Sequence, residues 1–380
     1  MRAIYFSEEH EAFRNQVRRF VVEEVRPNVD TWEEAGEIPR DVFRRMGELG
    51  FLGVRYAARY GGAEMDVFGS VVLAEELGRA GLSGFAASTL VHAEMASPHL
   101  ARYGSEDQKD SYMPGIVAGE IVTAIGVTEP GAGSDVAGMT TRAERRGNGW
   151  VLNGTKMFIT NGALANLYFI AARTDPAAKP SRGLSIFMVE KGAPGFEVAQ
   201  TLDKMGWRCS DTAELVFDDV ELTGDALLGE EGRGFYQIMD NFQNERLVMG
   251  AFATGEAERA LEITLEHVKT RQAFGAPLWD KQAVRLKLAE CATRIEANKA
   301  LVHHAAWLDR EGRDCVREVS MIKINAAEMV QHVVDTCLQL HGGSGYMRGM
   351  EIERMYRDVR IQSIGGGATE VMLEEVAKRL

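Results

Sequence analysis

The chain has 380 residues, of which 43 are Lys or Arg and 56 are Asp or Glu, so its formal net charge is −13. This acidic balance argues against a nucleic-acid-binding protein, and 45% hydrophobic residues argue against a disordered chain. No apolar run approaches the roughly 18 residues of a membrane span, and the first residues lack the apolar core of a signal peptide, so the sequence predicts no membrane insertion and a cytoplasmic location.

The first third of the chain is predicted to be helical. Ser7 precedes two acidic residues and can cap a helix, along which Phe13, Val17 and Phe20 recur at helical spacing. The segment Ser-Glu-Asp-Gln at 105–108 is a capping box that opens a further helix. We therefore expect an N-terminal α-helical domain over residues 1–120.

Short β-rich runs replace the helical pattern after residue 121. Asn-Gly turn signals occur at 148–149, 153–154 and 161–162, and the first lies between two polar–apolar runs, as in a β-hairpin. The predicted strands are 121–127, 150–152, 158–160, 167–170, 186–189 and 215–217. This pattern predicts a small antiparallel β-barrel or sandwich as a middle domain over residues 121–232.

Long helical patterns return after residue 233. They predict helices over 235–270, 277–310 and 315–340. Long antiparallel neighbours are typical of a helical bundle, so we expect a four-helix-bundle-like C-terminal domain over residues 233–380. The fold class is therefore α+β, in the order helix–β–helix.

One acidic residue lies on the apolar face of the first of these long helices. With a rotation of about 100° per residue, Ile238, Met249 and Phe252 all lie within about 40° of Glu245. The residues three and four positions away from Glu245 include no cation, so no ion pair along the helix can compensate its charge. The sequence therefore places this carboxylate on the core-facing side.

Two interpretations of Glu245 follow. It forms a buried pair with an arginine of another helix, or it is a carboxylate in an apolar cavity, whose pKa desolvation raises and which acts as a base. The next residue, Arg246, points about 100° away from the apolar stripe. It is either a surface or interface arginine or a contact for an anionic ligand.

Glycine is over-represented, with 40 residues in 380 against a usual ~7%. Three loops concentrate glycines: V-T-E-P-G-A-G-S-D at 127–135, Q-L-H-G-G-S-G-Y at 339–346 and I-G-G-G-A-T-E at 364–370. Each is either a turn or helix cap alone, or a loop that brings backbone amides to an anionic group. The four cysteines and eight histidines show no zinc-site spacing, so no metal site is predicted.

These loops, together with N-G-T-K-M-F-I-T-N-G at 153–162 and R-Q-A-F-G at 271–275, resemble the acyl-CoA dehydrogenases. The resemblance covers essentially the whole chain, with its motifs in the same order. It implies an FAD-dependent homotetramer, a dimer of dimers, that oxidises acyl-CoA thioesters to trans-2-enoyl-CoA in fatty acid β-oxidation. It also implies an electron-transferring flavoprotein as the electron acceptor.

The resemblance further implies roles for single residues. FAD would be bound by Val127, Thr128, Gly133, Ser134, Phe158, Ile159, Thr160, Ala368, Thr369 and Glu370, and across a subunit boundary by Arg271, Phe274, Gln282, Gln339, Leu340, Gly342 and Gly343. Acyl-CoA would be bound by Ser134, Phe242, Arg246 and Gly367. Phe158 stands where many members have Trp, and it still offers a flat apolar wall.

The chain departs from the family pattern at the catalytic base. Many members carry the catalytic glutamate in a Tyr-Glu-Gly-Thr motif, whereas residues 365–368 here are Gly-Gly-Gly-Ala, and Gly366 takes the place of that glutamate. A branch resembling isovaleryl-CoA and long-chain acyl-CoA dehydrogenases has the base in a helical Glu-Arg pair, which here is Glu245-Arg246. The resemblance and the helical wheel thus both indicate Glu245 as the base, while Gly366 would still offer a backbone N–H to the thioester oxygen.

Two alternative functions remain open from the sequence. The first is a flavin oxidase of the same fold, acting on acyl-CoA or a nitroalkane, in which oxygen reoxidises the flavin. The second is a non-catalytic acyl-CoA-binding subunit, which the missing acid at Gly366 suggests.

Overall fold

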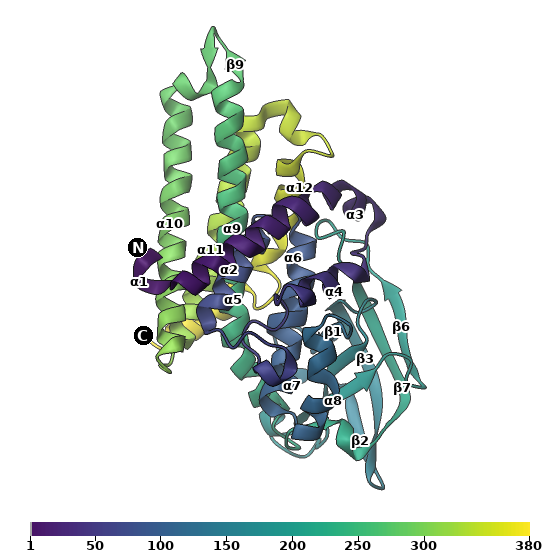
Figure 1. The fold of residues 1–380 in the computed structure, drawn as a ribbon. Helices are drawn as coiled ribbons and strands as arrows, with labels where there is room; N and C mark the ends of the chain where they lie inside the picture. Colours follow the sequence, from purple (N-terminus) through teal and green to yellow (C-terminus); the bar gives the residue numbers. More distant parts are fainter. Residues whose placement is uncertain (1) are drawn as a thin grey trace.

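The structure, a computed structural model that describes residues 2–380, begins with a group of helices (Figure 1). Both predicted caps are present, since Ser7 and Ser105 each accept a hydrogen bond from the backbone amide three residues later. The helices are α1 (Arg2–Tyr5), α2 (Glu8–Phe20), α3 (Val29–Ala35), α4 (Arg40–Glu48), α5 (Val67–Gly78), α6 (Ser83–Leu90), α7 (Ser97–Tyr103) and α8 (Glu106–Val117).

Two features of this helical group are not visible as an amphipathic pattern. Every residue of α5 is buried, because α2 packs against it from one side and α9 (Gly234–Thr270) from another. A helix that is covered all round has no polar face for a periodicity to reveal. In addition, the chain passes through two π-helical turns, η1 (Val21–Val25) and η4 (Val91–Ala96).

The middle of the chain forms an eight-stranded sheet, in the order β6-β7-β3-β2-β4-β5-β8 with β1 beside β4. Its strands are β1 (Thr123–Gly126), β2 (Arg142–Arg146), β3 (Gly149–Thr160), β4 (Leu167–Arg173), β5 (Leu184–Glu190), β6 (Phe196–Thr201), β7 (Thr212–Leu222) and β8 (Leu227–Leu228). Most pairs are antiparallel, as predicted, but β1 and the start of β2 pair with β4 in parallel. The β2–β3 hairpin lies between β1 and β4 in sequence and supplies the long connection that a parallel pair needs.

The strand β3 corrects two sequence predictions. The runs 150–152 and 158–160 are parts of one strand, and the Asn-Gly at 153–154 lies at a register shift against β7 rather than in a turn. The β2–β3 hairpin exists, but its two loop residues are Gly147 and Asn148, one position earlier than predicted. Gly147 supplies the positive φ, 60°, that a tight hairpin turn requires.

The strand β4 joins two apolar cores. Tyr168 and Ile170 belong to a core that consists mainly of residues of the strands. Leu167 and Phe169, on the other face of β4, pack with Leu100 of α7 and residues of α8. Because both faces of β4 are covered, it reads as a continuous apolar run, which is typical of a central strand. The N-terminal helices therefore cover one face of the sheet.

The C-terminal part consists of long helices, as predicted (Figure 1). α10 begins five residues later than predicted, because β10 and a 3-10 turn, η8 (Leu278–Asp280), come first. The further elements are β9 (Gln272–Ala273), β10 (Ala276–Pro277), α10 (Gln282–Arg310), α11 (Val316–His341), α12 (Glu351–Asp358), the 3-10 segment η10 (Val359–Ser363) and α13 (Thr369–Ala377). Among the helices described, none combines the length and apolar character that crossing a membrane requires.

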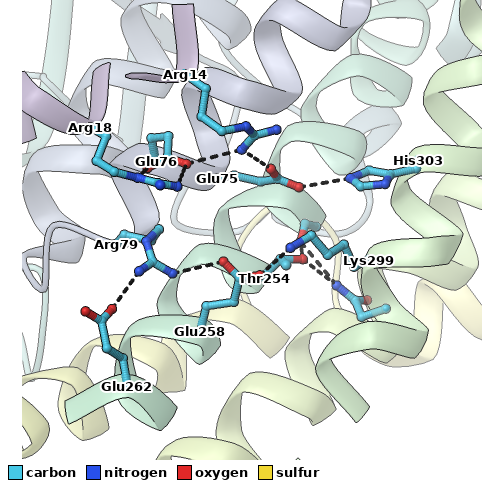
Figure 2. A network of polar contacts seen from close by, with 12 residues as sticks. Arg14, Arg18, Glu75, Glu76, Arg79, Thr254, Glu258, Glu262, Lys299 and His303 are labelled. Atoms are coloured by element: carbon cyan, nitrogen blue, oxygen red, sulfur yellow. Dashed lines mark hydrogen bonds and ion pairs between the residues drawn. The ribbon is translucent and has the colours of Figure 1, made fainter. Parts of the chain in front are cut away.

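A buried ionic network ties the two groups of helices together (Figure 2). Arg14 of α2 donates to Glu75 of α5 at 2.6 Å and to Glu76 at 3.2 Å, and His303 of α10 lies 3.1 Å from the other oxygen of Glu75. Arg79 continues the network to Glu258 and Glu262 of α9. Because the buried carboxylates of Glu75 and Glu76 are paired, their burial is compatible with their charge.

This network predicts a loss of stability in acid. Burial alone would raise the pKa of Glu75, but the hydrogen bond with His303 and the charge of Arg14 outweigh it and hold the pKa at about 2. The folded-state pKa lies below the ordinary 4.5, so this stabilisation is present above about pH 4.5 and is lost as the pH falls towards 2. Thermal melting across this window should show a falling Tm, and Glu75→Gln should melt lower at pH 7 but with a flatter profile. An unchanged slope in Glu75→Gln would contradict the assignment.

Candidate active site

Glu245 lies on α9 and is 7% exposed, so the predicted burial of this carboxylate is confirmed. Asn241, one turn earlier, donates from Nδ2 to Oε1 of Glu245 at 2.9 Å. Among the side chains described, those of residues 4–380, no arginine or lysine lies within ion-pair distance of the carboxylate, and the only charged neighbour that affects its pKa is Arg246 of the same helix, so the buried pair with another helix is not formed. Burial raises the pKa of Glu245 to about 7, against the opposing effects of Asn241 and the charge of Arg246. A carboxylate with this pKa can both lose and accept a proton near neutrality.

Arg246 is also buried, at 8% exposure, so the interpretation as a surface arginine is wrong for this chain. Its guanidinium lies over the ring of Phe242 at 5.4 Å, and its Nε atom is buried without a hydrogen-bond partner among the described residues. Burial lowers its pKa, and the neighbouring carboxylates of Glu245 and Glu375 oppose this effect. A buried cation with an unused donor is suited to an anionic or strongly polar partner from outside the chain.

Gly366 lies against α9 at Met249, which is one helical turn after Glu245. A Cβ atom at Gly366 would meet the sulfur of Met249 at 2.6 Å and the Cε atom of Lys323 at 3.5 Å. The structure thus brings Glu245, Arg246 and Gly366 into one region, as the sequence analysis expected. The backbone N–H of Gly366 donates no hydrogen bond within the described chain, so it is free for another acceptor.

Lys323 of α11 is part of this region and was missed by the sequence analysis. It is 3% exposed, and its ammonium group donates to the carbonyl of Gln362, just before the glycine loop. Burial and the charge of Arg246 lower its pKa to about 8. The signal was available, because Lys323 lies at helical spacing from the buried residues Val319 and Ala326.

Gly366 leads to a prediction about the vacant acid position. Its φ of 69° is unfavourable for any residue with a side chain, and an added Cβ also requires Met249 to move. Gly366→Ala should therefore lower the free energy of unfolding by about 1–2 kcal/mol, measured by urea titration. Gly365→Ala is the matched control, because its Cβ would meet Ile361 at an ordinary 3.7 Å. Equal stabilities of the two variants would contradict the strain assigned to Gly366.

The loop 127–135 is anchored to β3 by a buried ion pair. Lys156 donates to Glu129 at 2.8 Å and to the carbonyl of Val127 at 3.1 Å, and the amide of Met157 donates to the carbonyl of Thr128 at 2.9 Å. Burial would raise the pKa of Glu129, but the charge of Lys156 and its hydrogen bonds hold it at about 2. The amides of Val127 and Thr128 donate to nothing within residues 2–380, so they are available to a ligand.

Phe158 is turned outwards beside this loop. It has a φ of 61° and is 64% exposed, whereas Ile159 is buried and Thr160 is half-buried. A positive φ is unusual for an aromatic residue, and here it coincides with a register shift between β3 and β7. Such strain, combined with an exposed flat ring, is typical of a binding site. Gly133 and Ser134 are exposed at the end of the loop.

A second set of predicted FAD residues lies near the end of α9, the start of α10 and the end of α11. Arg271 follows Glu245 by 26 residues, about 39 Å along a helix. Phe274 is 96% exposed at the tip of the β9–β10 hairpin, which projects from the molecule in Figure 1. The rings of His267 and His341 stack at 4.2 Å, which brings the two long-helix ends together. This end set comprises Arg271, Phe274, Gln282, Gln339, Leu340, Gly342 and Gly343, and Figure 1 shows the β9–β10 hairpin projecting away from the sheet that anchors the loop 127–135.

The last predicted residues, Ala368, Thr369 and Glu370, form the start of α13. Ala368 is the N-cap and contributes no side-chain hydrogen bond, so the first amides of the helix are unpaired within the described chain. These amides and the positive end of the helix dipole favour an anionic group.

Comparison with known proteins agrees with this arrangement. The family models of the acyl-CoA dehydrogenase N-terminal, middle and C-terminal domains match residues 7–120, 124–220 and 232–380. The mitochondrial long-chain specific acyl-CoA dehydrogenase of Mus musculus is 42% identical over 376 residues, which cover 99% of this chain and 87% of that protein.

Solved structures show the same relationship. An acyl-CoA dehydrogenase from Geobacillus kaustophilus superimposes with a TM-score of 0.95 at 42% identity, covering 99% of this chain and 98% of the other. A glutaryl-CoA dehydrogenase from Mycobacterium smegmatis, solved in complex with FADH2, superimposes with a TM-score of 0.93 at 31% identity, covering 99% and 95%.

The residues present here fit a bound flavin. The free amides of Val127 and Thr128 suit the polar edge of the flavin ring, the exposed ring of Phe158 suits its face, and the unpaired amides of α13 suit a phosphate. The chain therefore belongs to the acyl-CoA dehydrogenase family of FAD-dependent oxidoreductases, and its cofactor is FAD.

Proposed function

We propose that this enzyme oxidises a saturated acyl-CoA thioester to the trans-2-enoyl-CoA, with Glu245 as the base that removes the α proton. The observation that carries the proposal is the buried carboxylate of Glu245, which has no cationic partner and whose pKa burial raises to about 7. The glycine at position 366 supports it, because no second acid is present at that place to act as base.

The chain's own groups can serve the proton transfer. The α hydrogen of a thioester is weakly acidic, so a base in a dry site and hydrogen-bond donors for the thioester oxygen are both needed. Glu245 takes the proton, and the free N–H of Gly366 donates to the oxygen as negative charge develops there. When bound, FAD supplies the acceptor for the hydride that leaves the β carbon.

The FAD site is proposed to lie between two subunits. Val127, Thr128, Gly133, Ser134, Phe158, Ile159, Thr160, Ala368, Thr369 and Glu370 would come from one chain, and the end set defined above from another. In Figure 1 the β9–β10 hairpin projects away from the sheet to which the loop 127–135 is anchored, so the two groups are proposed to come from different chains. This supports a site shared by two subunits, and the assembly is proposed to be a homotetramer built as a dimer of dimers.

The acyl-CoA is proposed to contact Ser134, Phe242, Arg246 and Gly367. The buried guanidinium of Arg246 has an unused donor, and the ring of Phe242 offers an apolar wall beside Glu245. The mouse relative named long-chain specific supports a role in β-oxidation of fatty acids. An electron-transferring flavoprotein as electron acceptor and a cytoplasmic location complete the proposal.

The chain is proposed to consist of three domains, which span residues 1–120, 121–232 and 233–380. The change from helices to strands between α8 and β1, and back to helices at α9, supports these boundaries.

Anaerobic titration with a panel of saturated acyl-CoAs tests the proposed reaction. We expect the visible absorbance of the flavin to bleach and one equivalent of enoyl-CoA to form for each flavin reduced. A flavin that acyl-CoA does not reduce would identify a binding subunit instead. Peroxide formation in air, without another electron acceptor, would identify an oxidase.

A further inference from the structure

Asn241 makes a set of hydrogen bonds that defines the orientation of its amide. Its Nδ2 atom lies 2.9 Å from Oε1 of Glu245, 3.0 Å from the carbonyl of Met95 and 3.4 Å from the carbonyl of Glu94. The carbonyls accept only, and an ionised carboxylate also accepts only, so the nitrogen and not the oxygen must point at them. Asn241 therefore acts towards Glu245 as a donor.

The carbonyls that hold Asn241 are available because of the local backbone. They belong to the last turn of the π-helical segment η4 (Val91–Ala96), where the regular hydrogen-bond register of an α-helix is interrupted. Pro98 stands four residues after Glu94 and has no N–H, so it provides no helical donor for the Glu94 carbonyl. Side-chain amides take the place of a backbone donor there: Asn244 donates to the Glu94 carbonyl at 3.0 Å, and Asn241 lies 3.4 Å from it and 3.0 Å from the Met95 carbonyl.

The two hydrogens of Nδ2 thus make hydrogen bonds to two different kinds of acceptor. One is directed at the carbonyls of η4 and fixes the amide, and the other reaches the carboxylate of Glu245. The second oxygen of Glu245, Oε2, receives no hydrogen bond from the described residues and is free to take a proton.

We propose that Asn241 is a positioning residue for Glu245. Its amide, anchored on the carbonyls of η4, donates to Oε1, stabilises the ionised carboxylate and leaves Oε2 to accept the substrate proton. The proposal rests on the role of Glu245 as base proposed above. A hydrogen bond to the charged form of an acid lowers its pKa, so Asn241 limits the increase that burial causes.

Other charged groups surround this pair but do not replace the contact. Arg246 is adjacent on α9, and Lys323 of α11 is occupied with the carbonyl of Gln362. Glu94 of η4 and Arg55 are both bonded to Asn244, and His99 of α7 is kept neutral because burial lowers its pKa to about 4. All of these charged and titratable residues are still present in a variant in which only Asn241 is replaced.

Asn244 offers a matched control on the same helix. It donates to the carbonyl of Glu94 at 3.0 Å and to the Glu94 carboxylate at 3.0 Å, so it also holds η4 against α9. It lies about 100° round the helix from Glu245 and has no hydrogen bond to it. Asn244→Ala therefore removes a similar packing contact without removing the bond to the base.

The experiment measures the titration of Glu245 in two ways. Infrared difference spectra of the holoenzyme, with Glu245→Gln as reference, follow the carboxyl group directly, and the pH profile of flavin reduction follows it through catalysis. In Asn241→Leu we expect both profiles to move up by about one pH unit. Flavin reduction at pH 7 should then be about fivefold slower, because less of Glu245 is ionised, and the wild-type rate should return at alkaline pH. Asn241→Ala is the second variant if the leucine disturbs folding, and Asn244→Ala should keep the wild-type profile.

The outcomes separate the two proposals. An unshifted infrared titration in the Asn241 variants, or an equal shift in Asn244→Ala, overturns the positioning role of Asn241. A shifted infrared titration without a shifted reduction profile supports the contact between Asn241 and Glu245 but overturns Glu245 as the base.

Discussion

Replacement of Glu245 by glutamine should abolish the bleaching of the flavin by acyl-CoA while FAD stays bound. Gln has nearly the same shape, and its carbonyl oxygen can still accept the hydrogen bond that Asn241 donates. It cannot take a proton from carbon, and loss of a general base typically costs about 10²–10⁴-fold in rate. Stopped-flow absorbance under anaerobic conditions measures the reduction, and the flavin spectrum after gel filtration measures FAD content.

Glu256 provides the control for this experiment. It lies 11 residues further along α9, about 20° from Glu245 around the helix, and it is fully buried too. Burial raises the pKa of Glu256 to about 8, and both oxygens of its carboxyl group are hydrogen-bonded, one to Ser83 and the other to Gln362. Glu256→Gln should therefore reduce its flavin within a few-fold of the wild-type rate. Full activity of Glu245→Gln would remove Glu245 from the mechanism.

Replacement of Lys156 by methionine should have the largest effect on stability. Lys156 is fully buried, and it neutralises Glu129 and holds the carbonyl of Val127. Methionine fills a similar volume but leaves a buried carboxylate without its cation, which typically costs about 3–5 kcal/mol. We expect a lower free energy of unfolding in urea and weaker retention of FAD, because the loop 127–135 loses its anchor.

The double variant Glu129→Gln with Lys156→Met separates charge from packing. It removes both charges at once, so it should recover part of the stability that the single variant loses. Thr140 and Thr141 donate their amides to Glu129, and glutamine can accept one of these bonds through its oxygen. A single variant as stable as the wild type would show that the pair does not anchor the loop.

Several structural features follow from local sequence alone. The N-cap at Ser7, the capping box at 105–108, the three long helices and the core-facing position of Glu245 were predicted and are present. Each depends on residues within one or two helical turns, where backbone geometry sets the relation between neighbours. The same reasoning applied to α11 would have identified Lys323 as a second charged residue on an apolar face.

Other features depend on contacts between distant segments. The sequence left Arg246 either at a surface or interface or in contact with an anionic ligand, and the packing around it leaves it 8% exposed, which rules out an exposed surface position in this chain. Phe158 resembles an ordinary strand residue in the sequence, yet a register shift against β7 turns it outwards. The parallel pairing of β1 with β4 likewise appears only when residues more than 40 positions apart meet.

The sequence by itself determined the helix–β–helix order, the family and the core-facing position of Glu245. Periodicity and motif spacing are local properties, so they can be recognised in the sequence without knowledge of the fold. Only the tertiary structure decided that the Asn241 amide contacts both Glu245 and a carbonyl of η4, that Lys323 and Met249 lie against Gly366, and that the β9–β10 hairpin projects away from the sheet. These relations are set by which elements pack together, because burial and hydrogen-bond partners come from segments that the chain brings together only when it folds.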